Sequence, residues 1–290
     1  MKPIATFSIV AHDPVRQEWG VAVQSKFLAV GAVVPWAKAG VGAVATQSYA
    51  NITYGIDGLA MMAEGKTAVE TIDTLTAADE LRERRQVGMV DAQGSAASFT
   101  GTACHDWAGG ITGDGFACQG NMLLPSTVET MAAFFEGARQ GGGELAQWLL
   151  ASLAAGQEAG GDKRGRQSAS LLVVREGGGY GGNNDRYIDL RVDDNPFPIR
   201  ELGRLLDLHR LYRGEVKPED LIPLADVALS LQKVLMHTRH YYGALDGTFN
   251  AETREALNTL VGIENLEDRW DGDGDLIDKA VVEFLVEKYA

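Results

Sequence analysis

The alternation of polar and apolar residues near the start of the chain predicts a set of short β-strands. Residues 6–11 read Thr-Phe-Ser-Ile-Val-Ala, which begins with the alternation of a half-buried strand. Two runs of small, mainly apolar residues follow at 20–25 and 41–47. Because successive side chains of a strand point to opposite faces, we expect Thr6 and Ser8 on the same face. The first strand therefore carries two hydroxyl groups on one side.

Strand and helix patterns continue to about residue 192 and predict a layered α+β domain. Helical periodicity or composition indicates helices at 58–75, 126–139 and 144–155. Further strands are expected at 85–91, 96–100, 116–121, 168–175 and 186–191. Helices placed between two sets of strands are typical of an α+β sandwich.

The composition of the chain changes near residues 193–198. The part from residue 221 onward is acidic, with helical patterns and few strand patterns. Apolar side chains at helical spacing predict a helix at 226–236, and further helices are expected at 251–261 and 278–289. We assign residues 1–205 to the first domain, 206–220 to a linker helix and 221–290 to a small all-α domain.

Charge and composition narrow the classes of partner. The chain has 290 residues with 26 basic and 40 acidic side chains, a formal net charge of -14. Such a field repels phosphate backbones, so we expect no nucleic-acid partner. No apolar run approaches the roughly 20 residues of a membrane helix, and the first residues make a poor signal peptide. With two cysteines only, a cytoplasmic protein is expected.

No metal or cofactor is expected from the motifs. Cys104 and His105 lack the second pair of ligands that a zinc site needs. The acidic run 271–275 resembles the start of an EF-hand loop, but Val282 stands where the closing glutamate belongs. The glycine runs at 141–143 and 177–179 are not followed by the Lys-Ser/Thr pair of a phosphate-binding loop.

The hydroxyls of the first strand suggest nucleophilic chemistry. Thr or Ser is a weak nucleophile unless a base takes its proton, and a free α-amino group, with a pKa of roughly 7.7–8.0, can be that base. Thr6 is the leading candidate, with Ser8 as the alternative. Lys38 is a candidate for electrostatic assistance, and Asp162 and Arg164 are candidates for orienting the nucleophile.

Candidate oxyanion donors are the backbone amides around Thr46–Ser48 and the side chain of Asn121. Together with the polar segment that ends at Ser168, these positions complete the predicted site. The predicted substrate-binding residues are Gln47, Ser48, Asn121, Arg164, Gln167 and Ser168.

Four segments, at 6–11, 29–47, 117–121 and 160–169, resemble a bacterial family of unknown function placed in the N-terminal-nucleophile (Ntn) hydrolase superfamily. The resemblance implies an αββα sandwich with a nucleophile on the first strand. In proteasome-like members a lysine follows the nucleophile by 32 positions, as Lys38 follows Thr6. The segment around Asp162 resembles the late loop that supports the amine of the nucleophile, although its spacing to Ser168 is longer.

The resemblance implies an amidohydrolase that cleaves a small amide or peptide-like bond. Thr6 is preceded by Met-Lys-Pro-Ile-Ala, so the mechanism requires the Ala5–Thr6 bond to be cut. The alternative is a non-catalytic binding or assembly protein that keeps the hydrolase-like scaffold. A third possibility uses Ser8 or a cysteine as an internal nucleophile. By analogy we expect a homodimer.

The motif at 241–257, Tyr-Tyr-Gly-Ala-Leu-Asp-Gly-Thr-Phe-Asn-Ala-Glu-Thr-Arg-Glu-Ala-Leu, resembles the peptidoglycan-binding domain, a three-helix bundle. Gly243 and Asp246–Gly247 would form its turns, with Leu231, Phe249 and Leu257 in the core. The resemblance implies a peptidoglycan fragment as a possible partner, and a protein partner is the alternative.

Overall fold

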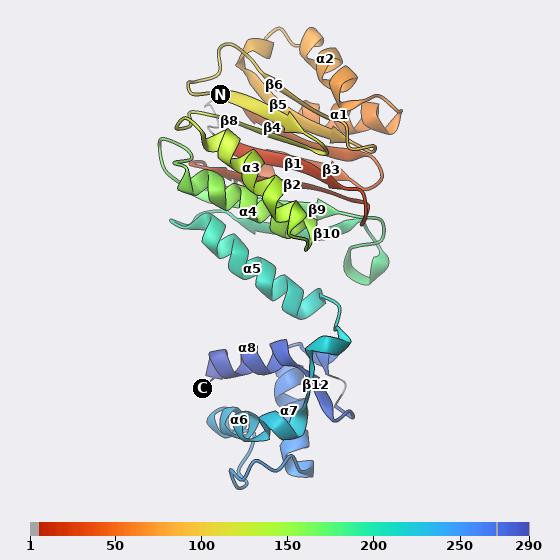
Figure 1. The fold of residues 1–290 in the computed structure, drawn as a ribbon, viewed down its shortest axis with the longest axis vertical. Helices are drawn as coiled ribbons and strands as arrows, with labels where there is room; N and C mark the ends of the chain where they lie inside the picture. The colour runs from red at the N-terminus through yellow and green to blue at the C-terminus, as the bar shows by residue number, and fades with distance from the viewer. Residues whose placement is uncertain (1–5, 271, 290) are drawn as a thin grey trace. The chain divides into compact units, whose positions relative to one another are not determined.

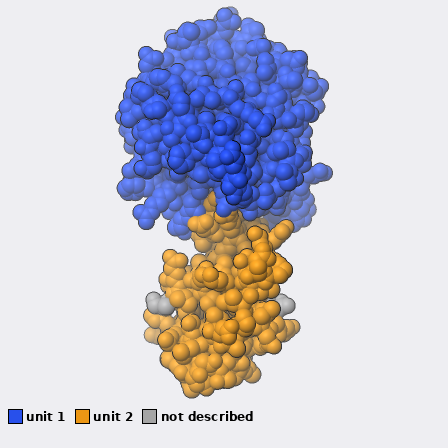
Figure 2. Space-filling view, in the orientation of Figure 1, with its two compact units in different colours: residues 1–205 blue, residues 206–290 orange. Residues whose placement is uncertain are grey.

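The computed structural model describes residues 6–270 and 272–289 and divides the chain into two compact units (Figures 1 and 2). Unit 1 runs to residue 205 and unit 2 begins at residue 206. The predicted mixed α+β class and the helical C-terminal region are confirmed. In the described residues, no helix is both long and apolar enough to cross a membrane.

Unit 1 contains two antiparallel sheets. The six-stranded sheet has the order β10-β9-β2-β1-β8-β7, and the four-stranded sheet has the order β3-β4-β5-β6. The strands of the larger sheet are β1 (Thr6–Asp13), β2 (Glu18–Ser25), β7 (Gly109–Gly113), β8 (Phe116–Asn121), β9 (Ser168–Val174) and β10 (Arg186–Val192). Those of the smaller sheet are β3 (Pro35–Lys38), β4 (Gly42–Ser48), β5 (Arg85–Asp91) and β6 (Ala96–Thr100).

Two pairs of helices enclose the sheets, which pack against each other through β1, β4, β5 and β8 (Figure 1). Helices α3 (Thr127–Gln140) and α4 (Leu145–Glu158) cover the six-stranded sheet. Helices α1 (Thr53–Ala63) and α2 (Ala68–Ala78) cover the four-stranded sheet. The order of layers is therefore helices, sheet, sheet, helices.

The single helix predicted at 58–75 is wrong, because the structure has two helices there. Gly65 adopts a φ of 94°, which ends the first helix in a conformation that favours glycine. Thr67 then caps α2: its side chain accepts from the Glu70 backbone, and the Glu70 carboxylate accepts from the Thr67 backbone. Strands β3 and β7 were not predicted.

The layer between the sheets changes character along the strands. Toward one end it is apolar, with Val10, Val21, Ala43, Val90 and Ala117 in one buried cluster. Toward the other end the same strands supply buried polar side chains, which we call the polar end of the interlayer. These are Thr6, Ser8, Ser25, Gln47, Gln86, Gln119 and Asn121.

Unit 2 is a helical bundle with one short two-stranded sheet. Helix α5 (Pro198–Arg213) contains the boundary between the units and is followed by α6 (Leu224–His237), α7 (Ala251–Ile263) and α8 (Lys279–Tyr289). Strands β11 (Leu221–Pro223) and β12 (Leu276–Asp278) pair antiparallel. The buried core includes Leu231, Leu257 and Leu285.

Two buried polar groups organise unit 2. The Gln232 amide donates to the Thr248 carbonyl at 3.0 Å and accepts from the Gly247 backbone at 2.9 Å, so it holds the loop before α7. Arg269 forms an ion pair with Asp278 at 2.6 Å and donates to the Leu211 carbonyl at the end of α5. Both side chains are largely buried, and each supplies the opposite charge that the other requires there.

Replacing Gly88 with Ala is expected to lower the free energy of unfolding by about 1–3 kcal/mol, since the added methyl group overpacks a filled interior. A Cβ at Gly88 would overlap the side-chain amide of Gln119 in the interlayer. Urea denaturation followed by tryptophan fluorescence measures the effect, because Trp19, Trp36, Trp107 and Trp148 all lie in unit 1.

Gly137→Ala is the matched control for this substitution. Gly137 lies inside α3, and an added Cβ would meet nothing within 4 Å. Because Ala favours helix, the control is expected to raise the free energy of unfolding by about 0.5–1 kcal/mol. Equal effects of the two substitutions would contradict the tight packing of Gly88.

Candidate active site

A row of four polar residues crosses the six-stranded sheet at one end of its strands. Thr6 is paired with Asn121 of β8 on one side and with Ser25 of β2 on the other, and Ser25 is paired with Ser168 of β9. All four are fully buried. The Thr6 hydroxyl donates to Ser25 Oγ at 3.2 Å. We call Ser168, Ser25, Thr6 and Asn121 the strand-end row.

An amide network faces this row from the other sheet. Gln47 Nε2 and Asn121 Nδ2 both donate to Gln86 Oε1, each at 2.9 Å. Gln86 Nε2 in turn donates to the Gly120 carbonyl at 2.7 Å. Gln47 Nε2 also lies 3.5 Å from the carbonyl oxygen of Thr6. Side-chain amides from β4, β5 and β8 therefore connect the two sheets beside Thr6.

Ser8 belongs to this network and is held between two amides. Its hydroxyl donates to Gln47 Oε1 at 2.7 Å and accepts from Gln119 Nε2 at 2.7 Å. Amide side chains do not act as bases, so neither partner can take the hydroxyl proton. This geometry favours a structural role for Ser8 over the nucleophile considered from the sequence.

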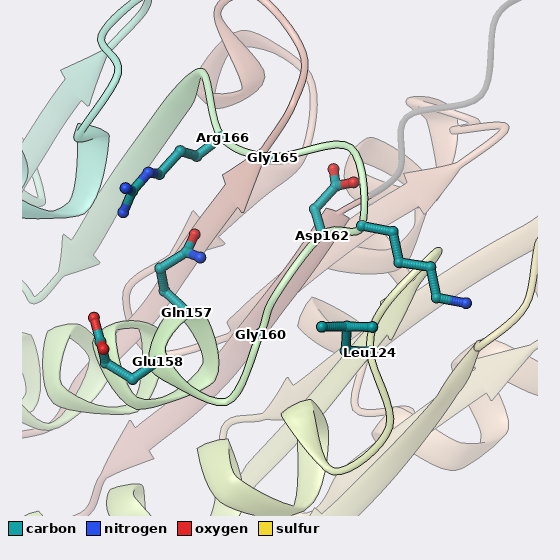
Figure 3. A pocket seen from close by; sticks show the side chains of 8 residues that line it. Leu124, Gln157, Glu158, Gly160, Asp162, Gly165 and Arg166 are labelled. Atoms are coloured by element: carbon teal, nitrogen blue, oxygen red, sulfur yellow. The ribbon is translucent and has the colours of Figure 1, made fainter.

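Asp162 lies in the loop at 160–166, which follows α4 at the same end of the sheet (Figure 3). Its buried carboxylate accepts from the Lys26 backbone at 3.1 Å and pairs with the Arg164 guanidinium at 2.9 Å. Because Lys26 directly follows Ser25, Asp162 fixes the chain beside the hydroxyl that Thr6 contacts. The structure thus brings Asp162 and Arg164 next to the strand-end row.

Gln167 and Ser168 anchor neighbouring segments. The Gln167 backbone donates to the Ser25 carbonyl at 3.0 Å, and its side chain donates to Asp194 at 3.0 Å. Ser168 Oγ donates to the Phe27 carbonyl at 2.5 Å and accepts from the Val30 backbone at 3.1 Å. These contacts position the end of β2 and the turn after it.

Lys38 is not brought to this site. It is exposed and ends β3, where it pairs with Gly42 at the start of β4. Gln47 and Ser48 lie at the other end of β4, so Lys38 is separated from the amide network by the length of that strand. The separation of 32 positions from Thr6 therefore does not correspond to proximity in space.

Two of the predicted oxyanion donors already have partners in this structure. Asn121 Nδ2 is bonded to Gln86, as described above, and the Thr46 backbone donates to the Val34 carbonyl at 3.2 Å. Gln47 and Ser48 belong to the ladder between β4 and β5. Ser48 has a φ of 64°, and Met122, directly after Asn121, has a φ of 55°. Strained conformations of this kind cluster at functional sites.

Two features of the site were missed from the sequence. Ser25 and Gln86 are polar residues near the ends of strands whose centres are small or apolar, a signal that they share with Gln24 and Arg85. Beside the network, Arg85 pairs with Asp79 at 2.8 Å and donates to the Tyr49 carbonyl at 2.5 Å. This ion pair fixes the chain just after Ser48, and no local pattern indicates it.

The two cysteines are free and buried. Burial raises the pKa of the Cys104 thiol and of the Cys118 thiol. Since the thiolate is the reactive form, neither sulfur has the environment of a nucleophile. The hypothesis that a cysteine is an internal nucleophile therefore loses its chemical basis.

Residues 6–202 match the model of the family described as "Family of unknown function (DUF1028)". Residues 214–285 match the model described as "Putative peptidoglycan binding domain". The predicted order, a domain of unknown function followed by one similar to peptidoglycan-binding domains, is confirmed.

The fold also resembles the crystal structure of protein SPO2555 from Silicibacter pomeroyi, which is assigned to DUF1028. The two are 29% identical with a TM-score of 0.65, and the match covers 72% of this chain and 91% of that chain. No curated protein matches this chain in sequence. The comparisons thus identify a family and a similar fold, but no activity.

The Arg85–Asp79 pair predicts a pH dependence of stability. Burial alone raises the pKa of Asp79, but hydrogen bonds from Arg85, the Leu81 backbone and Tyr54 outweigh it and lower the pKa from 3.8 to about 2. Ionised Asp79 therefore stabilises the fold at pH values above about 4, and this contribution is lost as the pH falls toward 2.

The urea midpoints of wild type and Asp79→Asn are expected to differ by a constant amount down to about pH 5, and the difference should shrink below about pH 4. Asp73→Asn, which removes an exposed carboxylate from α2, is the control. A wild-type advantage over Asp79→Asn that is the same at every pH would contradict this interpretation.

Proposed function

Because the chain belongs to the DUF1028 family, whose function is unknown, we propose an activity from the geometry of its own residues. Residues 6–202 hydrolyse a small amide or peptide-like bond, with Thr6 as the nucleophile once the Ala5–Thr6 bond has been cut. The observation that carries this proposal is the position of Thr6, which lies in the strand-end row beside the amide network and the Asp162 loop.

The layered fold supports the same proposal. Helices, sheet, sheet and helices follow one another in the order that the Ntn hydrolases share, and Thr6 lies on the first strand. We therefore assign unit 1 to that superfamily as part of the proposal. Ala5, which precedes the Ala5–Thr6 bond, lies outside the described residues.

In the proposed mechanism, cutting the Ala5–Thr6 bond leaves a free α-amine on Thr6. The amine takes the proton from Thr6 Oγ1, and the oxygen attacks the substrate carbonyl to form a tetrahedral intermediate. The C–N bond then breaks, the leaving amine takes the proton, and the acyl group stays on Thr6 as an ester. Water cleaves this ester in a second step. Ser25 holds the hydroxyl in place, and Asp162 is a positioning residue that acts through Lys26.

A chain that begins at Thr6 is expected to hydrolyse members of a panel of amides and short peptides, whereas Thr6→Ala loses roughly a thousandfold or more of the rate. Thr6→Ser should retain measurable activity because a hydroxyl remains. The measurement is amine release, with the intact mass of each preparation confirming whether residues 1–5 are present.

The full-length chain is the control for processing, since its Thr6 nitrogen is bound in a peptide. It should be inactive until the bond is cut. Undiminished hydrolysis by Thr6→Ala would remove Thr6 as the nucleophile, and activity of a chain whose mass includes residues 1–5 would remove the role of the α-amine.

A second function concerns unit 2, where we propose binding of a peptidoglycan fragment. Tyr242 is 79% exposed and Leu245 is 43% exposed, on the loop before α7 that Gln232 fixes. This loop lies in the segment that matches the peptidoglycan-binding model. An exposed aromatic ring on a fixed loop can pack against a sugar ring, because it offers apolar area at low entropic cost.

Tyr242→Ala is expected to weaken retention of the full-length chain on insoluble peptidoglycan by roughly tenfold, as loss of one aromatic contact predicts. Tyr180→Ala is the control, because Tyr180 is 76% exposed in unit 1. Co-sedimentation measures both. If wild type is not retained, or if both variants behave alike, the protein partner considered from the sequence becomes the better interpretation of unit 2.

A further inference from the structure

A groove lies on unit 1 where the end of α4 meets the loop at 160–166 and the start of α5. It consists of two cavities of about 460 and 450 Å³. Both are lined by Gln157, Glu158 and Arg166, so they adjoin. Each lies within the range of roughly 300–1,000 Å³ that small-molecule pockets occupy. We call this the α4–α5 groove.

One end of the groove is apolar. It is lined by Leu150 and Ala154 of α4, by Phe197 directly before α5 and by Ile199 in the first turn of α5. Phe197 is 51% exposed although it is a large aromatic residue. Burial of such surface is worth roughly 25 cal/mol per Å², so this end favours an apolar group.

The middle and the other end carry positive charge. Arg166 lines the first cavity (Figure 3) and also the second. Its guanidinium lies 4.5 Å from the centre of the Phe197 ring. Lys163 adds a second cation at the other end, and Arg200 lies at the rim of the cavity that Leu150 and Phe197 line. Among the described residues, neither Arg166 nor Arg200 forms an ion pair with a carboxylate. This gathering of cations is unusual in a chain with a net charge of -14.

The acidic residues of the groove limit the kind of anion. Asp162 is already paired with Arg164, so it does not compete for Arg166. Glu158 is exposed in the shared wall and repels a second negative charge. A guanidinium binds a carboxylate through two parallel hydrogen bonds. A singly charged carboxylate therefore fits this wall better than a doubly charged phosphate.

We propose that the α4–α5 groove binds an amphipathic carboxylate, with its apolar chain between Leu150, Phe197 and Ile199 and its carboxylate against Arg166. This site is separate from the hydrolysis proposed for Thr6 and does not require it. It nevertheless borders the same loop, because Asp162 lines the groove and also holds Lys26 beside the strand-end row.

Isothermal titration of the full-length chain with decanoate, below its micelle concentration, tests the proposal. Decanoate is expected to bind with one-to-one stoichiometry, and decanol at least roughly tenfold more weakly, since it lacks the charge that Arg166 recognises. Arg166→Gln should weaken the binding of decanoate by roughly tenfold and leave the binding of decanol nearly unchanged. Arg82→Gln, which removes an exposed arginine elsewhere on unit 1, is the control and should bind as wild type does.

Two further variants keep the outcome decisive. Ala154→Trp fills the apolar end and should abolish binding of both compounds, with the thermal unfolding midpoint reporting that the variant is folded. Thr6→Ala should bind decanoate normally, so failure of the hydrolase proposal leaves this result unaffected. Absence of decanoate binding, equal binding of decanol, or tighter binding of decyl phosphate would each overturn the proposal. An equal loss in Arg82→Gln would also overturn it, because the effect would then reflect net charge alone.

Discussion

The amide network between the two sheets is the constraint on which the arrangement of unit 1 depends. A buried amide without a partner costs about 1–3 kcal/mol, so Gln47, Gln86 and Asn121 must meet one another when the sheets pack. Hydrogen bonds are directional, whereas the apolar contacts at the opposite end, such as those of Val10 and Ala43, tolerate small displacements. The network therefore fixes the relative position of β1, β4, β5 and β8, and Thr6 is positioned as a consequence.

The same principle holds the other segments around the site. Asp162 carries a buried charge that is compensated by Arg164 and by the Lys26 backbone, so the loop at 160–166 closes onto the end of β2. In unit 2, Gln232 fixes the loop before α7 in a similar way. Because polar residues at these places support the fold as well as the site, loss of activity in a variant is informative only beside a measurement of its stability.

Much of the fold follows from local patterns, and the site follows from them only in part. The strands predicted at 85–91, 96–100 and 116–121 coincide with β5, β6 and β8, because alternation and β-propensity act within a few residues. Lys38 shows the limit of sequence spacing. The β3–β4 hairpin turns the chain back, so β4 delivers Gln47 to the site and leaves Lys38 at the far end. The partners of Gln86 come from strands distant in sequence, which no local pattern can specify.

The state of the Thr6 nitrogen decides whether the proposed chemistry can occur. In the intact chain this nitrogen is part of a peptide bond, which has no useful basicity, and the Thr6 side chain is fully buried. Cutting the bond creates an α-amine, a group whose pKa in model peptides is roughly 7.7–8.0, close to the value a general base needs near neutral pH. Ser25, which accepts from the Thr6 hydroxyl, belongs to β2. It is held there by its pairing with Ser168 and by the Lys26–Asp162 contact. In the proposed mechanism, processing therefore supplies the base without having to build the rest of the site.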